Sequence, residues 1–286
     1  MFSSDSRKDG FIRLILVCAC FLSGIFSPAD ADVLKGEHAL QLMIEKNNLP
    51  NLLEVFQTVS YFDPKVDSMT ADHEQHVRYR IPGEFRADIR ADGFERIHVA
   101  SSDEALIIVD GRIISETEGW TDHYKDIFVY RDRKQLVEKL ESLGINFSVT
   151  SLGRYQGVIC YVMGADYPDE SVPQLWVAKD TFRPVRWIFE AAAGSDGVRE
   201  QKEILYKDWQ SHYLTWYPSR IEFFEGRRLV QDIRVQRVST DPSFSRDLFD
   251  MARLKRTFTP LVHEEKKAED RNDISHQIEE FKKIFE

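Results

Sequence analysis

Apolar and polar residues alternate along much of this chain, most clearly between residues 76 and 119. Residues 77–81 and 85–89 place apolar side chains at every second position, with charged side chains between most of them. Because the side chains of a strand point alternately to its two faces, each stretch predicts a strand with one apolar and one wet face. Pro82-Gly83, Asp92-Gly93 and Asp110-Gly111 separate such stretches and favour tight turns. The pattern predicts an antiparallel meander whose apolar face must be covered.

Helical spacing replaces this alternation in two parts of the domain. Residues 36–60 carry apolar side chains at helical spacing on both sides of Pro50, which predicts two helices or one kinked helix. Residues 132–144 predict a further helix, with Asp132 as its N-cap and Gly144 at its C-terminal end. Strands are expected before it, to about Tyr130, and again from Phe147 to about Val238.

The spacing of these elements predicts one mainly β domain over residues 32–262. Successive strands are about ten residues apart, and no long polar linker interrupts the segment. One sheet with only two or three helices offers few partners for the large apolar side chains of its strands. A strongly curved sheet would leave an apolar groove suited to an acyl chain. Alternatively, the helices fill the groove and its lining is core, and the pattern leaves both possibilities open.

Residues 1–31 are predicted to be a secretory signal peptide. A basic start precedes an apolar run over residues 14–26, which is too short to span a bilayer comfortably, and Ala29-Asp30-Ala31 is a small-x-small cleavage site. The mature chain is expected to begin at Asp32 and to enter the periplasm of a two-membrane bacterium. An uncleaved anchor and a lipid-modified Cys20 are the alternatives.

Residues 263–286 form a charged segment without a strand pattern. Ile274, Ile278, Phe281 and Phe285 recur at helical spacing, which predicts an appended amphipathic helix. Such a short helix must pack against something to be stable. It is expected to dock on its own domain, on a partner or over the mouth of the groove.

Charge and motif content argue against several classes of function. The net charge of −10 and the lack of a basic stripe argue against nucleic-acid binding. Cys160 lies in an apolar stretch and is interpreted as a buried hydrophobe. His73 and His76 lack the spacing of a helical metal site. No residue is nominated as catalytic, and no metal or cofactor is predicted, although a hydrolase with an unrecognised site stays open as a weaker alternative.

Several short motifs occur in a characteristic order. They are YRIPGEFR over residues 79–86, IIVDG over 107–111, WVAKDTFRP over 176–184, YPSRI over 217–221 and DLF over 247–249. In the order and spacing of these motifs, the sequence resembles the LolA/LolB-like periplasmic lipoprotein-carrier superfamily. The resemblance implies a curved antiparallel sheet forming an open half β-barrel, lidded by the N-terminal and central helices. It implies a non-enzymatic carrier that binds acyl chains of lipoproteins or other lipids for transfer towards the outer membrane. The alternative is a lipid-sensing or assembly module of the same fold.

The resemblance and the alternation together nominate a set of inward-facing lipid-binding residues: Tyr79, Ile81, Phe85, Ile89, Ile97, Val99, Trp187, Phe189, Tyr206 and Phe223. The expected partners are acyl chains and a membrane-bound donor or acceptor protein, with transient membrane contact. In the chaperone of this superfamily an arginine directly precedes the proline of the first motif, where this sequence has Ile81. Arg80 is expected on the opposite face of the strand. The role of the chaperone's arginine is therefore not assigned to any residue of this sequence.

Overall fold

The computed structural model describes residues 33–261, except 64–67, 92, 102–103 and 190–200. The predicted signal peptide and the predicted helix over 263–286 lie outside the described residues. The elements described below belong to one compact unit that begins at Leu34.

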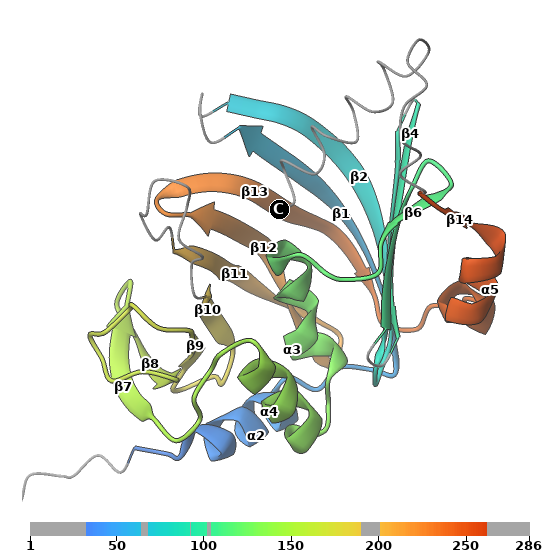
Figure 1. Ribbon diagram of the computed structural model, residues 1–286. Helices are drawn as coiled ribbons and strands as arrows, with labels where there is room; N and C mark the ends of the chain where they lie inside the picture. The colour runs from blue at the N-terminus through green and yellow to red at the C-terminus, as the bar shows by residue number, and fades with distance from the viewer. Residues whose placement is uncertain (1–32, 64–67, 92, 102–103, 190–200, 262–286) are drawn as a thin grey trace, which may run out of the picture. The chain divides into compact units, whose positions relative to one another are not determined.

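The strands of the described residues form a single sheet that is curved but not closed (Figure 1). Its order is β14-β6-β5-β4-β3-β2-β1-β13-β12-β11-β10-β9-β8-β7, and every neighbouring pair is antiparallel except β6 and β14. This confirms the predicted fold class. The strands are β1 (Leu52–Asp63), β2 (Ser68–Arg80), β3 (Glu84–Ala91), β4 (Phe94–Ser101), β5 (Glu104–Val109), β6 (Arg112–Ser115), β7 (Thr150–Tyr155), β8 (Val158–Met163), β9 (Gln174–Ala178), β10 (Pro184–Phe189), β11 (Lys202–His212), β12 (Thr215–Glu225), β13 (Arg228–Ser239) and β14 (Thr259–Pro260).

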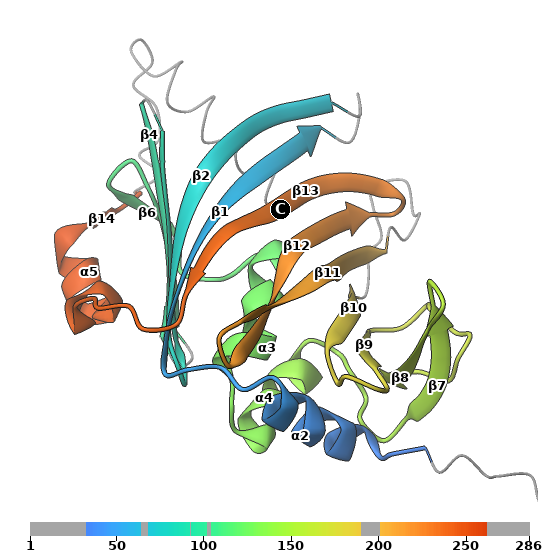
Figure 2. The ribbon, with the colours of Figure 1, turned by 180° about the vertical axis from the view of Figure 1, so that it is seen from behind.

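The helices lie on both sides of this sheet (Figures 1 and 2). The concave side carries α2 (Gly36–Lys46), the 3-10 helix η1 (Trp120–Lys125), α3 (Asp126–Val129) and α4 (Arg133–Ser142). We call these four elements the lid. The other side carries the 3-10 helix η2 (Arg246–Phe249) and α5 (Met251–Thr257). Among the described residues, no helix has the length and apolar character needed to cross a membrane.

The central helix α4 forms where its caps predict it. The Asp132 side chain accepts a hydrogen bond from the backbone N–H of Gln135 at 3.0 Å, which satisfies a donor of the first turn. Leu136 and Leu140 share one face and are fully buried. Gly144 follows the helix with φ of +92°, a conformation in which a Cβ would be strained. The same local signals therefore set both ends of the helix in the sequence and in the structure.

Two segments differ from the predicted elements. Helix α2 ends at Lys46, and residues 52–63 form β1 instead of a second helix. Inside β1 the buried positions alternate, and the strand pairs on both sides with β2 and β13 near the centre of the sheet. This pairing outweighs the weak helical spacing of its apolar residues. The strands predicted to continue to Tyr130 end at Ser115, because residues 120–129 form η1 and α3.

The main core lies between the concave face of the sheet and the lid. It combines apolar side chains of the lid helices with large residues such as Tyr79, Trp187, Tyr217 and Phe223 from the strands. A second, smaller cluster lies on the other face, where α5 covers β4, β5 and β6. Cys160 is buried without a disulfide, and burial raises the pKa of its thiol to about 11, as expected for a small hydrophobe.

Candidate functional site

The concave face under the lid is the candidate site, because most of the predicted lipid-binding residues lie there. Seven of the ten belong to the main core cluster, and none of them is more than 7% exposed. Phe128 of α3 is a central contact, with its ring centroid 4.9 Å from that of Tyr217 and 6.1 Å from that of Tyr206. The seven are Tyr79, Ile81, Phe85, Trp187, Phe189, Tyr206 and Phe223.

Ile89 marks the border of this apolar layer. It is fully buried, but its direct neighbours on the adjacent strands are the polar residues Gln75 and Arg96. Directly opposed residues of an antiparallel pair share one face of the sheet. Ile89 therefore lies on the concave face beside polar side chains and outside the main apolar cluster.

The prediction that Ile97 and Val99 face inward is wrong. Both belong to the second cluster, together with Leu254 of α5, on the opposite face of the sheet. The pairing of β3 with β4 sets Arg96 opposite Ile89 and His98 opposite Ala87, so the polar residues of β4 face the lid. Apolar and polar residues do alternate along β4, but its apolar residues are on the outer face, where α5 covers them.

Side chains of the lid fill the apolar layer in this structure. Phe128, Leu136, Leu140 and Leu40 are all at most 2% exposed. Two cavities among the described residues are lined largely by polar side chains, one of about 10 Å³ on the concave side and one of about 290 Å³ on the outer side. Of the two alternatives that the sequence left open, this closed state corresponds to the one in which the helices fill the groove.

A cluster of buried charges joins the lid to the sheet. Lys125 Nζ lies 2.6 Å from Glu118 Oε1 and 2.8 Å from Asp126 Oδ1. His98 of β4 contacts the same Glu118 carboxylate at 2.8 Å, and Asp122 lies 3.2 Å from Arg96. We call these residues, together with His123 and Lys139, the lid charge cluster. It holds three carboxylates, one guanidinium, two ammonium groups and two imidazoles, so every carboxylate has a basic group beside it.

The lid charge cluster keeps its carboxylates ionised in spite of their burial. Burial by itself raises the pKa of the Glu118 and Asp126 carboxyls, but the Lys125 ammonium beside them outweighs it and both pKa values are lowered. For Asp122 the nearby His98 and Arg96 likewise outweigh burial and lower its pKa. Burial lowers the pKa of Lys125, but Asp126 and Glu118 outweigh this and raise it. Each of these groups therefore stays ionised only because oppositely charged groups lie beside it.

Part of this cluster resembles a cation site. Glu118, His123 and Asp126 offer ligand atoms that all lie within 4.8 Å of one another. Lys125 already supplies the positive charge between the two carboxylates. A metal ion would have to displace a buried ammonium group and its hydrogen bonds. The arrangement is explained as an internal ion-pair cluster, and no metal is assigned to it.

The lowered pKa values predict a loss of stability in acid. Carboxyls whose pKa is lower in the folded than in the unfolded chain contribute stability above their unfolded pKa of about 4, and this contribution is lost as the pH falls towards the folded pKa. We expect the melting temperature to fall steadily from about pH 5 downwards. The melting temperature of Asp122→Asn should fall less steeply with decreasing pH than that of the wild type, because one of the titrating groups is gone. Identical slopes for the two proteins would contradict this role of Asp122.

Arg131 links two parts of the lid. Its guanidinium donates hydrogen bonds to the backbone carbonyls of Ile44 and, at 2.8 Å, Asn47 at the C-terminal end of α2. Burial lowers the pKa of Arg131 to about 10. By contrast, Arg80 pairs with Glu84 at 2.7 Å and its neighbour Tyr79 is buried, in keeping with the expectation that Arg80 points away from the groove.

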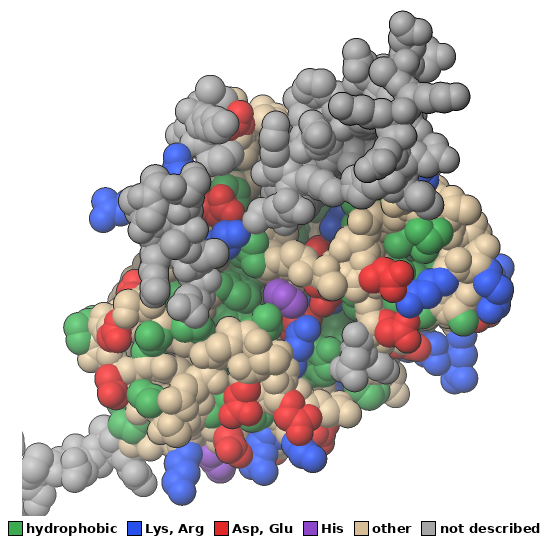
Figure 3. All heavy atoms as spheres, viewed as in Figure 1, with side chains coloured by type: hydrophobic (Ala, Val, Ile, Leu, Met, Phe, Trp, Pro, Cys, Tyr) green, Lys and Arg blue, Asp and Glu red, His purple; other side chains and the backbone are tan. Residues whose placement is uncertain are grey.

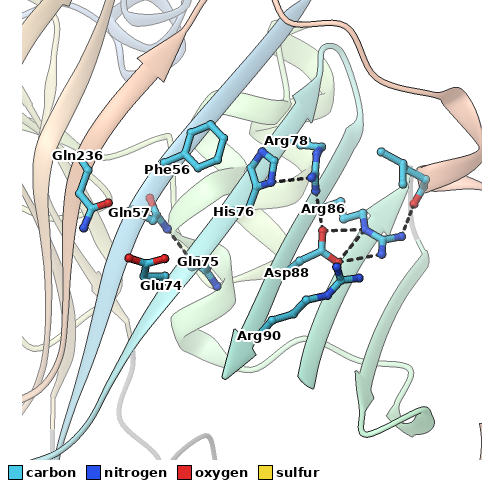
Figure 4. A pocket seen from close by; sticks show the side chains of 11 residues that line it. Phe56, Gln57, Glu74, Gln75, His76, Arg78, Arg86, Asp88, Arg90 and Gln236 are labelled. Atoms are coloured by element: carbon cyan, nitrogen blue, oxygen red, sulfur yellow. Dashed lines mark hydrogen bonds and ion pairs between the residues drawn. The ribbon is translucent and has the colours of Figure 1, made fainter. Parts of the chain in front are cut away.

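The larger cavity lies on the outer face, between β1–β3 and η2 (Figure 4). Asp88 sits in its floor and pairs with Arg78 at 2.6 Å and Arg86 at 2.8 Å. Arg86 also donates to the backbone carbonyl of Leu248 at 3.0 Å, which holds η2 against the sheet. Arg78 Nε also lies 3.8 Å from a Glu54 carboxylate oxygen, so two carboxylates balance the two guanidiniums. The cleft is explained as the joint between the sheet and η2.

The surface of the concave side is mixed in character. In the space-filling view of Figure 3, hydrophobic side chains lie next to acidic, basic and histidine side chains on this face. The contacts below them have the same mixture, since Tyr124 packs edge-on against Phe85 and Phe223 while its neighbour Lys125 belongs to the lid charge cluster. The candidate site thus combines a broad apolar layer with a buried polar border.

No protein-family model and no curated protein matches this sequence. Solved structures do match its fold. A DUF1329 family protein from Desulfovibrio piger aligns with a TM-score of 0.54 and 13% identity, covering 79% of this chain and 100% of its own. A LolA superfamily protein from Nitrosomonas europaea aligns with a TM-score of 0.51 and 12% identity, covering 77% of this chain and 99% of its own. A domain assigned as an outer membrane lipoprotein-sorting protein, from Vibrio parahaemolyticus, aligns with a TM-score of 0.51 and 11% identity, covering 78% of this chain and 99% of its own. The chain has the fold of the LolA superfamily.

Proposed function

We propose that this protein is a periplasmic carrier that binds the acyl chains of lipoproteins or other lipids between its sheet and its lid. The observation that carries the proposal is the nature of the covering layer. A broad apolar sheet face is covered by short helical elements instead of a second sheet. Such a layer can separate from the sheet without breaking strand pairing. The fold that it shares with a LolA superfamily protein supports this interpretation.

Binding would replace lid side chains by acyl chain. In the closed state Phe128 and its neighbours occupy the apolar layer, so a ligand must displace part of the lid. Each methylene group moved from water into an apolar site contributes about 0.8 kcal/mol, so a long acyl chain offers on the order of 10 kcal/mol. This gain must offset the free energy needed to separate the lid side chains from the sheet. The same balance makes release to an acceptor protein or membrane feasible.

The proposal predicts that purified mature protein carries lipid and that its affinity depends on chain length. Organic extracts should contain acyl-chain lipids by mass spectrometry. In competition with a fluorescent fatty acid, the affinity of saturated fatty acids should rise by up to about fourfold per methylene until the groove is full. Protein that yields no lipid on extraction and shows no displacement by any chain length would contradict the carrier function.

A further inference from the structure

The turn between β11 and β12 presents two large apolar side chains to solvent. His212 and Thr215 pair across this hairpin, so Tyr213 and Leu214 form its two-residue loop. Tyr213 is 84% exposed and Leu214 is 69% exposed, the two highest values for large hydrophobic side chains among the described residues. Single exposed apolar residues are ordinary on a protein surface, but two adjacent ones at the tip of a hairpin form a projecting apolar surface.

The backbone of this loop does not explain its side chains. Tyr213 has a φ of +59°, which lies in the left-handed region. Two-residue hairpin loops favour glycine, asparagine or aspartate at such a position, because a larger side chain is strained there. Leu214 gains no stability from burial, since it stays exposed. The pair is therefore a poor choice for folding, and residues that break a local rule of folding are expected where they serve a function.

The residues behind the loop resemble those of a membrane–water interface. Trp209 and Trp216 are both half-buried. The guanidinium of Arg183 stacks on the Trp216 ring at 3.4 Å, and the indole N–H of Trp209 donates to the backbone carbonyl of Pro184 at 3.1 Å. Tryptophan and tyrosine favour the boundary between hydrocarbon and water, and arginine there reaches the lipid head groups.

The small size of the loop favours a lipid surface over a protein surface. A specific protein interface buries about 800 Å² on each partner, from roughly 20 to 30 residues. A two-residue tip offers much less than this area. A bilayer accepts a projecting apolar tip without a complementary pocket, and the shallow insertion of two side chains gives weak and reversible binding.

The loop lies at the end of the sheet that carries α2. Strands β1 and β12 are both antiparallel to β13, so they begin at the same end, where α2 precedes β1 and the loop precedes β12. Contacts connect the two. Phe182, next to Arg183, accepts a hydrogen bond on its backbone carbonyl from the Asn47 side chain at 2.8 Å. Asn47 follows α2, and its own carbonyl accepts from Arg131 of the lid at 2.8 Å.

We propose that the Tyr213-Leu214 loop inserts into the surface of a phospholipid bilayer and holds the neighbouring end of the lid against that surface. The inference rests on the proposed function for the use of this contact, which is to pass an acyl chain to the membrane without exposing it to water. The insertion itself requires only the loop and the bilayer.

The test is the double variant Tyr213→Gly/Leu214→Ser, measured by co-sedimentation with vesicles of phosphatidylethanolamine and phosphatidylglycerol. Its partition coefficient should be at least about tenfold lower than that of the wild type, because both inserting side chains are gone. Its melting temperature should not fall, because glycine accepts the positive φ and no buried contact is lost. Its affinity for a fluorescent fatty acid in solution should be unchanged, because the loop lies outside the apolar layer.

Met69→Ser is the matched control. Met69 is 57% exposed, but it lies at the start of β2, which pairs with the end of β1 and so marks the opposite end of the sheet. This variant should bind vesicles as the wild type does. Equal vesicle binding by the loop variant and the wild type would overturn the inference and leave the carrier function standing. A wild-type protein that binds vesicles through the loop but binds no fatty acid would support the membrane contact and contradict the carrier function.

A second copy of the chain is the other occupant that the experiment can detect. Sedimentation velocity without vesicles should give the same oligomeric state for the wild type and the loop variant. A change of oligomeric state in the loop variant, with vesicle binding retained, would assign the loop to self-association and overturn the inference.

Discussion

Replacing Lys125 with methionine should lower the free energy of unfolding by about 3–5 kcal/mol. The Lys125 side chain is 2% exposed and lies between the carboxylates of Glu118 and Asp126. Methionine fills a similar volume but leaves two buried carboxylates without their shared counter-ion. At the size of this domain the loss corresponds to a fall in melting temperature of roughly 10 °C. Thermal unfolding followed by circular dichroism measures it directly.

A matched control is available on the lid itself. Lys134 is also a lysine of the lid, paired with Glu138 at 3.7 Å, but its side chain is 83% exposed. Lys134→Met should change the free energy of unfolding by less than about 0.5 kcal/mol, because an exposed ion pair contributes little. Equal melting temperatures for the two variants would show that the lid charge cluster does not hold the lid in place.

Linking α2 covalently to the sheet should abolish most of the acyl-chain binding. Gly36 begins α2, and a Cβ placed on it would lie 2.7 Å from Thr150 Oγ1 of β7. In a disulfide each Cβ lies roughly 3 Å from the far sulfur, so Gly36→Cys with Thr150→Cys places two thiols close to bonding distance. The disulfide would hold the N-terminal end of the lid closed. Since binding requires lid displacement, we expect the oxidised protein to bind a fatty acid at least about tenfold more weakly.

Local signals were sufficient for much of the fold. The alternation over β2 and β3, the turn at Asp110-Gly111 and the caps of α4 all predicted the elements found there. The turn has positive φ at both residues, +47° and +76°, which is the geometry that an Asp-Gly pair favours. These features depend on residues that are neighbours along the chain. Strand β1 is set by its long-range pairing with β2 and β13, and there the prediction that helix continues to residue 60 was wrong.

The candidate site was predictable only in its apolar half. Seven of the ten predicted residues reach the main core cluster, because alternation fixes the face of each strand once one face is known. Ile97 and Val99 were assigned to the wrong face, since nothing local shows that α5 covers the outside of β4. The lid charge cluster was missed because its members come from β4, η1, α3, α4 and the segment before η1. One local signal existed: the acidic and basic residues 122, 123, 125 and 126 lie within a run, residues 121–129, that is buried throughout.

The central claim is that an acyl chain binds between the sheet and the lid. The most direct measurement is titration of a fluorescent fatty acid into Gly36→Cys/Thr150→Cys protein, oxidised and then reduced, with Thr150→Cys alone under the same oxidant as control. Cys160 is buried and is expected to stay reduced in both. The account predicts weak binding in the oxidised double variant and recovery of wild-type affinity on reduction. Equal affinity of the oxidised and reduced proteins would contradict it.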